Sequence, residues 1–346
     1  MPYWKACRTV VIRILGQHWL AASSPRSTAR LLGSWHGKKK RGCQMRSESL
    51  RSRKDCARSV VDTTGRVWVV GSIGWDRVYA VDAVPARGGF AEARSFEVRP
   101  GGTGLNTAVG LASADVDTLL VGYVGRDGTG DSLLQWLETL GLETSYIQRW
   151  QVPTAEVAIL VDSEGERTMV GAHEDALGSL NFPCARVSRG DIVFFSAAAP
   201  AKPSVLEELR NSGAVVVSVP SGVEALEAAD YLLGSEEQFE ENGGISSYAA
   251  AMRNAVACKE VIVTHGEEGV RMLSRKGEVH IPAESVSVKD ATGAGDAFAA
   301  GMLAGLVRGE SIEQSVRLGN RWGASAVARE GSTPPEWADV FGEEIR

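Results

Sequence analysis

Short apolar runs alternate with amphipathic stretches along most of the chain. Runs of four to seven residues rich in Val and Ile predict buried strands, because a strand covered on both faces has little polar surface. Strands that alternate with helices predict a largely parallel sheet wrapped by helices. The predicted strands span 67–70, 118–124, 157–161, 192–195, 214–219 and 261–264, and the predicted helices span 104–114, 132–140, 204–211, 247–258, 295–306 and 312–328.

Two segments, 77–100 and 154–170, interrupt this rhythm with shorter, alternating and more polar sequence. Alternation of apolar and polar residues is typical of strands that are buried on one face only. We therefore expect these segments to form a small sheet that protrudes from the main one, where it can cover a site.

The formal net charge of -6 hides a strong asymmetry. Residues 1–61 hold 14 basic and two acidic residues, a net of +12, whereas 62–346 hold 23 basic and 41 acidic residues, a net of -18. Nucleic-acid binding needs clustered Lys and Arg to neutralise phosphates, so the acidic body argues against a nucleic-acid partner. No apolar run approaches the roughly 18 to 20 residues that a membrane-spanning helix needs, and we expect no membrane partner.

The basic segment, 1–61, shows no sustained alternation or helical stripe and is predicted to be a disordered N-terminal extension. Two interpretations stay open. Apolar residues near 10–20 with Arg8 and Arg13 are typical of an organellar transit segment. Alternatively, the chain is over-extended at its start, and the natural start is Met45. We expect a cytoplasmic protein, or an organellar one if the extension is a transit segment.

The five Cys residues are an odd number and lack Cys-x-x-Cys spacing. Disulfide frameworks and structural zinc sites use even or closely paired cysteines. The sequence therefore predicts a fold built on neither.

The strongest chemical signal is Asp-Ala-Thr-Gly-Ala-Gly-Asp at 290–296, which opens a predicted helix. A small-residue turn at a helix start presents unpaired N–H groups to an anion, so Gly293, Ala294 and Gly295 form a candidate anion cradle. At the helix start, the dipole is expected to keep Asp296 ionised. An ionised carboxylate there can accept the proton of an attacking hydroxyl, as phosphoryl transfer requires. The alternative is that Asp296 is a simple helix cap.

A second glycine-rich segment, Gly-Gly-Thr-Gly-Leu-Asn at 101–106, precedes another predicted helix. Its glycines let the backbone approach a small ligand. The Asn106 amide can both donate to and accept from sugar hydroxyls.

Together these segments resemble the ribokinase-like, or PfkB, family of carbohydrate kinases over roughly residues 66 to 340. The resemblance is carried, in family order, by the strand and turn that end in Asp76 and by the segments 101–106, 121–130, 263–269 and 290–296. It implies an α/β fold, namely a three-layer α/β/α domain with a mostly parallel central sheet and a small β-strand lid near 77–100 and 154–170. In this family the lid often mediates homodimers.

The resemblance also implies roles for individual residues. Asp296 is similar to the general base, and Gly293, Ala294 and Gly295 to the anion hole. Further residues are similar to family positions that contact ligands: Asp76, Gly102 and Asn106 for the sugar, Gly266, Gly269 and Ser235 for the nucleotide, and Asp290, Thr292 and Gly331 for K+.

Several positions point to particular branches of the family. Glu166-Arg167-Thr168 resembles a stretch of ketohexokinases whose Arg reaches toward the sugar; the alternative for Arg167 is a surface lid residue. The family's Asn-x-x-Glu element is Ser235 to Gln238 here, and ketohexokinase-like members also carry Ser at its first position. The candidates for Mg2+ support are then Glu236 and Glu237. His265 is expected to be a solvent-facing loop residue.

The resemblance implies an ATP-dependent kinase, with Mg2+ and with K+ as a further candidate cofactor, that phosphorylates a hydroxymethyl group of a ketohexose such as fructose, or of ribose. Two alternatives stay open: a non-catalytic sugar or nucleotide binder with this fold, and a nucleoside kinase, which would need an apolar slot for the base. Ser196 stands where ribokinases place a Glu against the sugar. A sugar phosphate would need basic residues at the site, for which Arg99 and Arg167 are the candidates.

The separation of the motifs from the basic extension can be tested by truncation. Every motif lies beyond residue 66, so a chain that begins at Met45 should keep the kcat and KM of the full-length chain. Steady-state kinetics of the two proteins would check this. A large loss of activity on truncation would show that the extension takes part in folding or catalysis.

Overall fold

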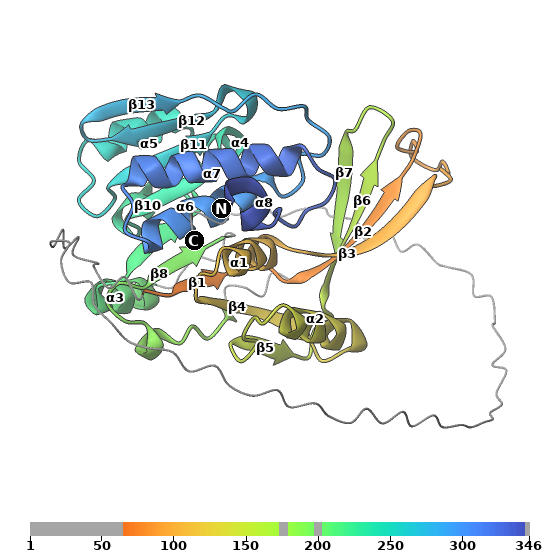
Figure 1. Ribbon diagram of the computed structural model, residues 1–346, viewed down its shortest axis with the longest axis horizontal. Coiled ribbons are helices and arrows are strands. Elements are labelled where there is room, and N and C mark those ends of the chain that lie inside the picture. The colour runs from red at the N-terminus through yellow and green to blue at the C-terminus, as the bar shows by residue number, and fades with distance from the viewer. Residues whose placement is uncertain (1–64, 173–178, 197–202, 343–346) are drawn as a thin grey trace, which may run out of the picture. The chain divides into compact units, whose positions relative to one another are not determined.

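A nine-stranded sheet forms the centre of the chain in the computed structural model, which describes residues 65–172, 179–196 and 203–342 (Figure 1). The predicted extension, 1–61, lies outside these residues. The strand order is β13-β12-β11-β10-β9-β8-β1-β4-β5. The strands are β1 (Val67–Val70), β4 (Thr118–Gly125), β5 (Ile147–Trp150), β8 (Ile192–Phe195), β9 (Val215–Ser218), β10 (Tyr231–Ser235), β11 (Glu260–Thr264), β12 (Val270–Ser274) and β13 (Gly277–Ile281).

All strands from β11 to β5 in this order are parallel, and β12 and β13 add an antiparallel edge. The chain moves from β1 to β4 and β5 on one side, then crosses to β8 on the other side of β1. The direction of winding therefore reverses between β1 and β8. Ligands of open α/β sheets bind at the carboxyl ends of the strands at such a reversal.

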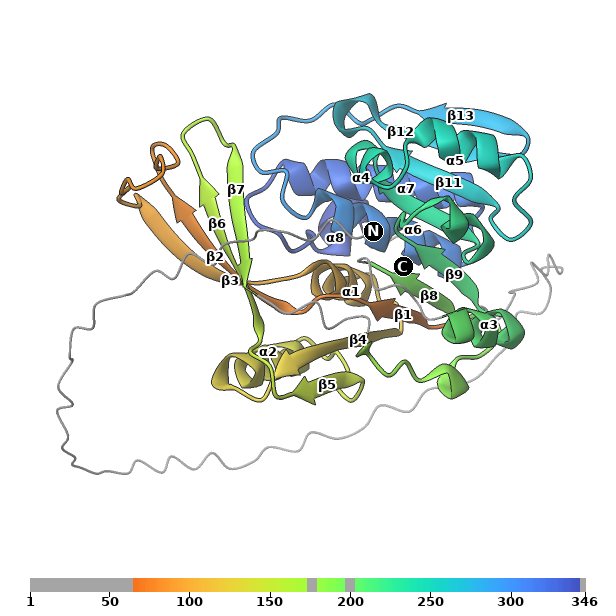
Figure 2. The same cartoon turned by 180° about the vertical axis from the view of Figure 1, so that it is seen from behind.

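Helices cover both faces of this sheet, which confirms the predicted three layers. Val67 and Val69 of β1 pack into a core shared with α1 (Thr103–Ser113), α2 (Gly128–Thr139), α6 (Ala294–Val307), α7 (Ile312–Val327) and α8 (Trp337–Phe341). Trp68 and Val70 point the other way, into a core with α3 (Pro203–Ser212), α4 (Glu236–Glu241) and α5 (Ile245–Met252). Figures 1 and 2 show α7 and α5 on opposite sides of the sheet. None of the helices in the described part of the chain is long and apolar enough to cross a bilayer.

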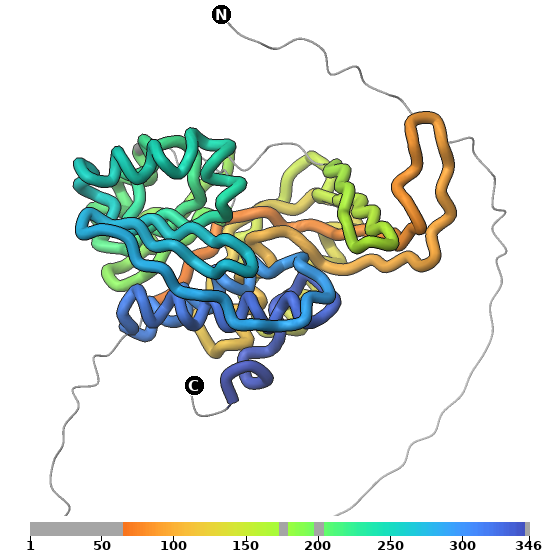
Figure 3. The backbone as a smooth tube through the Cα atoms, turned by 90° about the horizontal axis from the view of Figure 1, so that it is seen from above, coloured from red at the N-terminus to blue at the C-terminus, as the bar shows by residue number. Residues whose placement is uncertain are grey.

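A separate four-stranded sheet, β3-β2-β6-β7, forms the predicted lid. Its strands are β2 (Gly74–Ala80), β3 (Ser95–Gly101), β6 (Ala155–Val161) and β7 (Arg167–Ala172). In Figure 3 the orange hairpin of β2 and β3 reaches well beyond the main sheet. Most residues of β3 and all of β7 are exposed, which explains their alternating and polar sequence. Three short 3-10 helices complete the described elements: η2 (Cys184–Arg186), η3 (Val223–Glu227) and η4 (Gly266–Glu268).

Glycines bring α6 into unusually close contact with its neighbours. A Cβ added at Gly301 would lie 2.8 Å from the Cα of Gly319 in α7, and one added at Gly110 in α1 would lie 2.9 Å from the Cβ of Ala300. Helices that pack this closely have little freedom to slide or rotate. Because α6 begins within the 290–296 segment, this packing determines where that segment lies.

Some predicted boundaries were wrong for identifiable reasons. The helix expected over 247–258 ends at Met252, because the chain turns and the Cys258 N–H bonds to the Leu226 carbonyl on the way to β11. The helix expected from 132 begins at Gly128, because Asp127 caps it by accepting from the Gly130 N–H. The hairpin of β12 and β13 was not predicted, since its second strand is mostly exposed and carries charge.

The close contact of α6 and α7 predicts the effect of one added methyl group. Replacing Gly301 with Ala should force the two helices apart and lower the free energy of unfolding by roughly 1–3 kcal/mol. Gly128 is a matched control, because it is exposed, lies in the first turn of α2 and has no neighbour within 4 Å among the described atoms. Gly128→Ala should be neutral or slightly stabilising. Urea denaturation of both variants would test this, and equal stability of the two would contradict the packing argument.

Candidate functional site

The residues predicted to contact the sugar and the transferred group meet where α1 and α6 begin. Gly102 is the N-cap of α1 and has a φ of 104°. A Cβ at this position would lie 2.5 Å from the Ser72 carbonyl oxygen, so only glycine fits. A Cβ at Gly101 would collide with the Asp76 carboxylate, which is thereby packed against the same turn.

A hydrogen bond between Asn106 and Asp296 joins the two helix starts directly. The Asn106 Nδ2 donates to the Asp296 Oδ2 over 2.8 Å, between residues 190 positions apart in the sequence. Asn106 is 4% exposed, and its Oδ1 is buried without a hydrogen-bond partner among the described residues. A buried acceptor without a partner is costly. The Asn106 Oδ1 is therefore suited to accept a bond from a ligand hydroxyl.

The electrostatics of Asp296 differ from the prediction. The helix dipole was expected to keep its carboxylate ionised, but the pKa of Asp296 is raised to about 7. Burial is the main cause, the bond from Asn106 opposes the shift, and the nearby Asp76 adds to it. Desolvation disfavours the charged form of a carboxylate, and here this effect outweighs the bond from Asn106. Asp76 is 7% exposed, and burial raises its pKa as well, although Arg99 and Ser332 oppose this.

The predicted anion cradle has the expected backbone shape. Gly293 is the N-cap of α6 in a left-handed conformation, with a φ of 75°, and a Cβ there would collide with the Ser332 carbonyl. A Cβ at Gly295 would meet no atom within 4 Å in the described ranges. The N–H groups of Gly293 and Gly295 bond to no acceptor there, whereas the Ala294 N–H makes a long 3.4 Å bond to the Ala291 carbonyl. The open donors at this helix start, among the described residues, are those of the two glycines and of Asp296.

Two lid arginines reach the segment just before this cradle. The Arg167 Nη1 donates to the Thr292 Oγ1 over 2.6 Å, so Arg167 is more than a free surface residue. The Arg99 Nη2 lies 3.8 Å from the Asp290 Oδ2. Asp290 also accepts bonds from the N–H groups of Thr292, at 2.8 Å, and Gly331, at 3.2 Å. The lid thus contacts the cradle segment through charged side chains.

A chain of hydroxyl groups lines the same region; the sequence analysis named Ser196 at the sugar side but missed Ser72 and Thr103. The Thr103 Oγ1 lies 3.1 Å from the Ser196 Oγ and 3.3 Å from the Ser72 Oγ. Ser72 and Ser196 follow β1 and β8, the two strands at which the winding reverses. Both residues directly follow predicted buried strands, which could have marked them as candidate site residues. The sequence did not show, however, that these two strands are neighbours in the sheet.

The predicted nucleotide residues gather at the carboxyl ends of β10 and β11, where Ser235 pairs in register with Thr264. Ser235 and Gln238 form a capping box on α4, so these two residues complete a helix start. Gly266, with a φ of 52°, and Gly269, with a φ of 99°, shape the turn between β11 and β12. No described hydrogen bond or ion pair connects this group with Asp296.

His265, in the same turn, was expected to face solvent, and that expectation was wrong. Its side chain is only 6% exposed, and its Nδ1 lies 3.1 Å from the Glu236 Oε2. Of the two carboxylates predicted to support Mg2+, Glu236 is therefore engaged with His265. Glu237 makes no described polar contact and is exposed.

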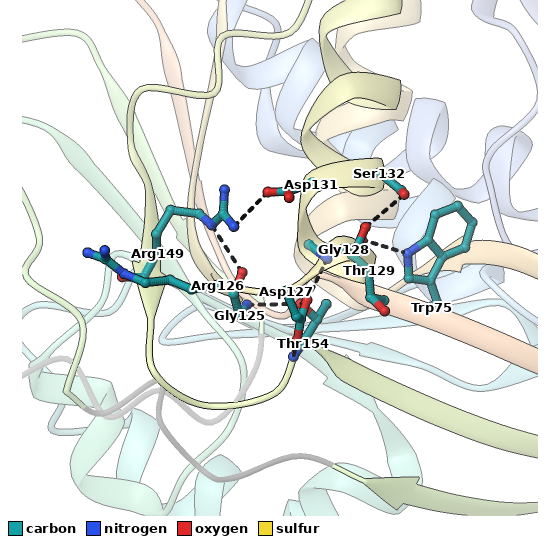
Figure 4. Close-up of polar contacts among 11 residues, drawn as sticks. Trp75, Gly125, Arg126, Asp127, Gly128, Thr129, Asp131, Ser132, Arg149 and Thr154 are labelled. Atoms are coloured by element: carbon teal, nitrogen blue, oxygen red, sulfur yellow. Dashed lines mark hydrogen bonds and ion pairs between the residues drawn. The ribbon is translucent and has the colours of Figure 1, made fainter.

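The segment 121–130 has a structural role at the base of the lid (Figure 4). The Asp127 Oδ1 accepts from the Gly130 N–H over 2.7 Å and from the Thr154 Oγ1 over 2.6 Å. Thr154 directly precedes β6, and Trp75 of β2 donates its Nε1–H to the Thr129 carbonyl over 3.2 Å. Asp127 and its neighbours thus anchor two lid strands to the start of α2.

Comparison with known proteins agrees with this geometry. Residues 64–339 match the model of the pfkB family carbohydrate kinases. The chain is 29% identical over 286 residues to the ATP-dependent ribose-1-phosphate kinase of Halopiger xanaduensis, covering 80% of this chain and 96% of that protein. It is 29% identical over 306 residues to a fructokinase of Escherichia coli, covering 78% and 95%.

A solved structure shares the fold as well. The ribokinase of Thermotoga maritima superposes with a TM-score of 0.69 at 27% identity, covering 80% of this chain and 97% of that one. A family match over most of the chain establishes the class of protein. The chain belongs to the pfkB family of carbohydrate kinases and is a phosphotransferase with an alcohol group as acceptor.

Proposed function

We propose that this protein transfers the γ-phosphoryl group of ATP to a hydroxymethyl group of a small sugar, with Asp296 as the general base. The observation that carries the proposal is the contact of Asn106 with Asp296 beside the open N–H groups of the cradle. It supports the proposal because a carboxylate, a buried amide oxygen without a partner among the described residues and unpaired backbone N–H groups lie in one site.

The step follows from the chemistry of these groups. Asp76, the Gly102 backbone and the Asn106 Oδ1 would hold the hydroxyls of the sugar. Asp296 would take the proton from the hydroxymethyl O–H, and that oxygen would bond to the γ-phosphorus while the bond to the leaving oxygen of ADP breaks. The amides of Gly293 and Gly295 would stabilise the negative charge on the transferred group. With a pKa of about 7, roughly half of the Asp296 carboxylates are ionised at neutral pH, and the group can be protonated during turnover.

Magnesium fits the residues on the nucleotide side. Mg2+ in kinases is usually bound by one or two carboxylates together with the nucleotide phosphates, and the described residues contain no group of three or more metal-binding side chains. Glu237 is the carboxylate that remains open for this, since Glu236 contacts His265. When bound, Mg2+ would neutralise charge on the phosphates.

A neutral sugar such as fructose or ribose is the first candidate acceptor. The chain of hydroxyls from Ser72 through Thr103 to Ser196 can donate to and accept from sugar hydroxyls without imposing a charge. The fructokinase and ribokinase relatives support this class.

A phosphorylated pentose is the second candidate. Arg167 brings a guanidinium group from the lid to Thr292, beside the cradle, where it could pair with an anionic substituent of the acceptor. The similarity to a ribose-1-phosphate kinase favours testing this class.

Exposed apolar side chains on the lid support the expected homodimer. Phe96, Met169 and Val170 are 52%, 61% and 62% exposed on lid strands. An exposed apolar group of this kind on a projecting sheet is typical of a surface that another chain covers.

The function can be tested with an acceptor panel and one substitution. ADP release should be measured with fructose, ribose, ribose 1-phosphate and inosine, for the native chain and for Asp296→Asn. The variant keeps a side-chain oxygen for Asn106 but cannot take the proton, so kcat should fall by on the order of 10²- to 10⁴-fold while sugar binding by calorimetry persists. Retained turnover would refute Asp296 as the base. Binding without turnover by the native chain would indicate a non-catalytic binder, and preference for inosine a nucleoside kinase.

The pKa of Asp296 predicts the pH dependence. The base must be ionised, and its pKa of about 7 lies above the ordinary value for an aspartate, so activity is lost as pH falls through 7. The kcat/KM for the sugar should be constant above about pH 8 and fall to about one tenth of this plateau at pH 6. Stopped-time assays from pH 5.5 to 9 would measure it. An unchanged kcat/KM down to pH 5.5 would be inconsistent with this environment of Asp296.

A further inference from the structure

The resemblance to the family implies a K+ site at Asp290, Thr292 and Gly331, and the contacts of these residues argue against such a site. K+ is bound by shells of oxygen ligands such as carbonyl groups. The Gly331 N–H points toward the Asp290 Oδ2, over 3.2 Å, and so takes an acceptor position of the carboxylate that a cation would need.

The carboxylate of Asp290 is also largely occupied. A carboxylate offers about four acceptor positions. The Oδ1 accepts two bonds from Thr292, from its N–H over 2.8 Å and from its Oγ1 over 2.5 Å. The Oδ2 accepts the bond from Gly331 and faces the Arg99 guanidinium at 3.8 Å. One of the four acceptor positions of Asp290 therefore remains open, and the Arg99 guanidinium lies next to it.

Arg99 is positioned for this contact by the lid. It lies in β3 directly opposite Asp76 of β2, and side chains of directly paired residues project from the same face of a sheet. Its side chain is 14% exposed, and that of Asp290 is 20% exposed. Its Nε is buried without a partner among the described residues. A guanidinium group cannot lose its proton in a protein, so its charge is always present.

The second lid arginine occupies another part of the expected K+ site. The Arg167 Nη1 donates to the Thr292 Oγ1, which in turn donates to Asp290. A monovalent cation placed among these groups would lie close to two guanidinium charges in a partly buried region, where like charges repel more strongly than in water.

We propose that Arg99 supplies the positive charge at Asp290, so that this kinase works without a monovalent cation. The pair holds the segment 290–292, and with it the start of α6, in the conformation that presents the cradle. Arg99 is a positioning residue, because it acts through Asp290. The inference rests on the proposed role of the cradle in phosphoryl transfer.

The test compares cations at equal ionic strength. The full-length chain is assayed in KCl and in choline chloride, with kcat, the affinity for ADP by calorimetry and the Tm measured in each. K+ should change none of the three for the native chain. In Arg99→Met, Asp290 loses its cation, and kcat in choline chloride should fall by on the order of tenfold, since small displacements of a catalytic group are that costly. K+ should then restore kcat and ADP affinity and raise the Tm by about 3 °C at roughly ten times its dissociation constant.

Two control variants make the outcomes distinct. Arg94→Met removes another lid arginine, which pairs with Asp82 away from the site, and should gain no response to K+. Arg99→Lys keeps a positive charge and should stay independent of K+, which also covers the case in which Arg99→Met does not fold.

Three results would overturn the proposal: activation or stabilisation of the native chain by K+, a response of Arg99→Lys to K+, or a folded Arg99→Met that lacks any cation response. In the last case a raised KM for a phosphorylated acceptor would assign Arg99 to the substrate instead. The Tm and the affinity for ADP can be measured without turnover. They therefore still test the role of Arg99 if the protein shows no sugar kinase activity.

Discussion

The site depends on one hydrogen bond between two helix starts that are 190 residues apart, that of Asn106 with Asp296. The bond requires α1 and α6 to lie very close together, which the small residues Gly110 and Ala300 permit. A larger side chain at either position would separate the helices and with them the acceptor site from the base. Close packing of small residues in the middle of the two helices therefore determines how Asn106 and Asp296 lie relative to each other at the helix starts.

Two carboxylates in this small region, Asp290 and Asp296, have different surroundings. Asp296 is desolvated and has one neutral donor, so burial raises its pKa to about 7. Asp290 is also partly buried, which by itself raises its pKa, but bonds from Thr292 and Gly331 and the charge of Arg99 hold that pKa below its usual range. Carboxylates whose environments separate their pKa values in this way can act as base and as structural anion within one site.

The motifs found in the sequence have different roles in the structure: some lie at the candidate site, and others stabilise the fold around it. The segment 290–296 opens α6, and we propose that it forms the cradle and carries the base. Asp127 in the segment 121–130, in contrast, has a structural role. Both of its carboxylate oxygens accept hydrogen bonds from Gly130 and Thr154, which anchors the lid to α2. Ser235 and Gln238 likewise complete a capping box. Asp127 contributes to the family resemblance through a structural role, and the lid that it anchors carries Arg99 and Arg167 to the segment before the cradle.

Local sequence determined most of the elements of this protein and the chemistry of its turns. Apolar runs predicted β1, β4, β8, β9 and β11 of the main sheet but not β10, and glycine-rich turns predicted the starts of α1 and α6, because burial and backbone conformation limit which residues can stand at these positions. The tertiary structure decided which groups meet. The contact of Asn106 with Asp296, the hydroxyl chain through Thr103 and the approach of Arg99 to Asp290 each join segments far apart in the sequence. The ionisation of Asp296 was decided there as well, since desolvation depends on everything packed around a group and not on its neighbours along the chain.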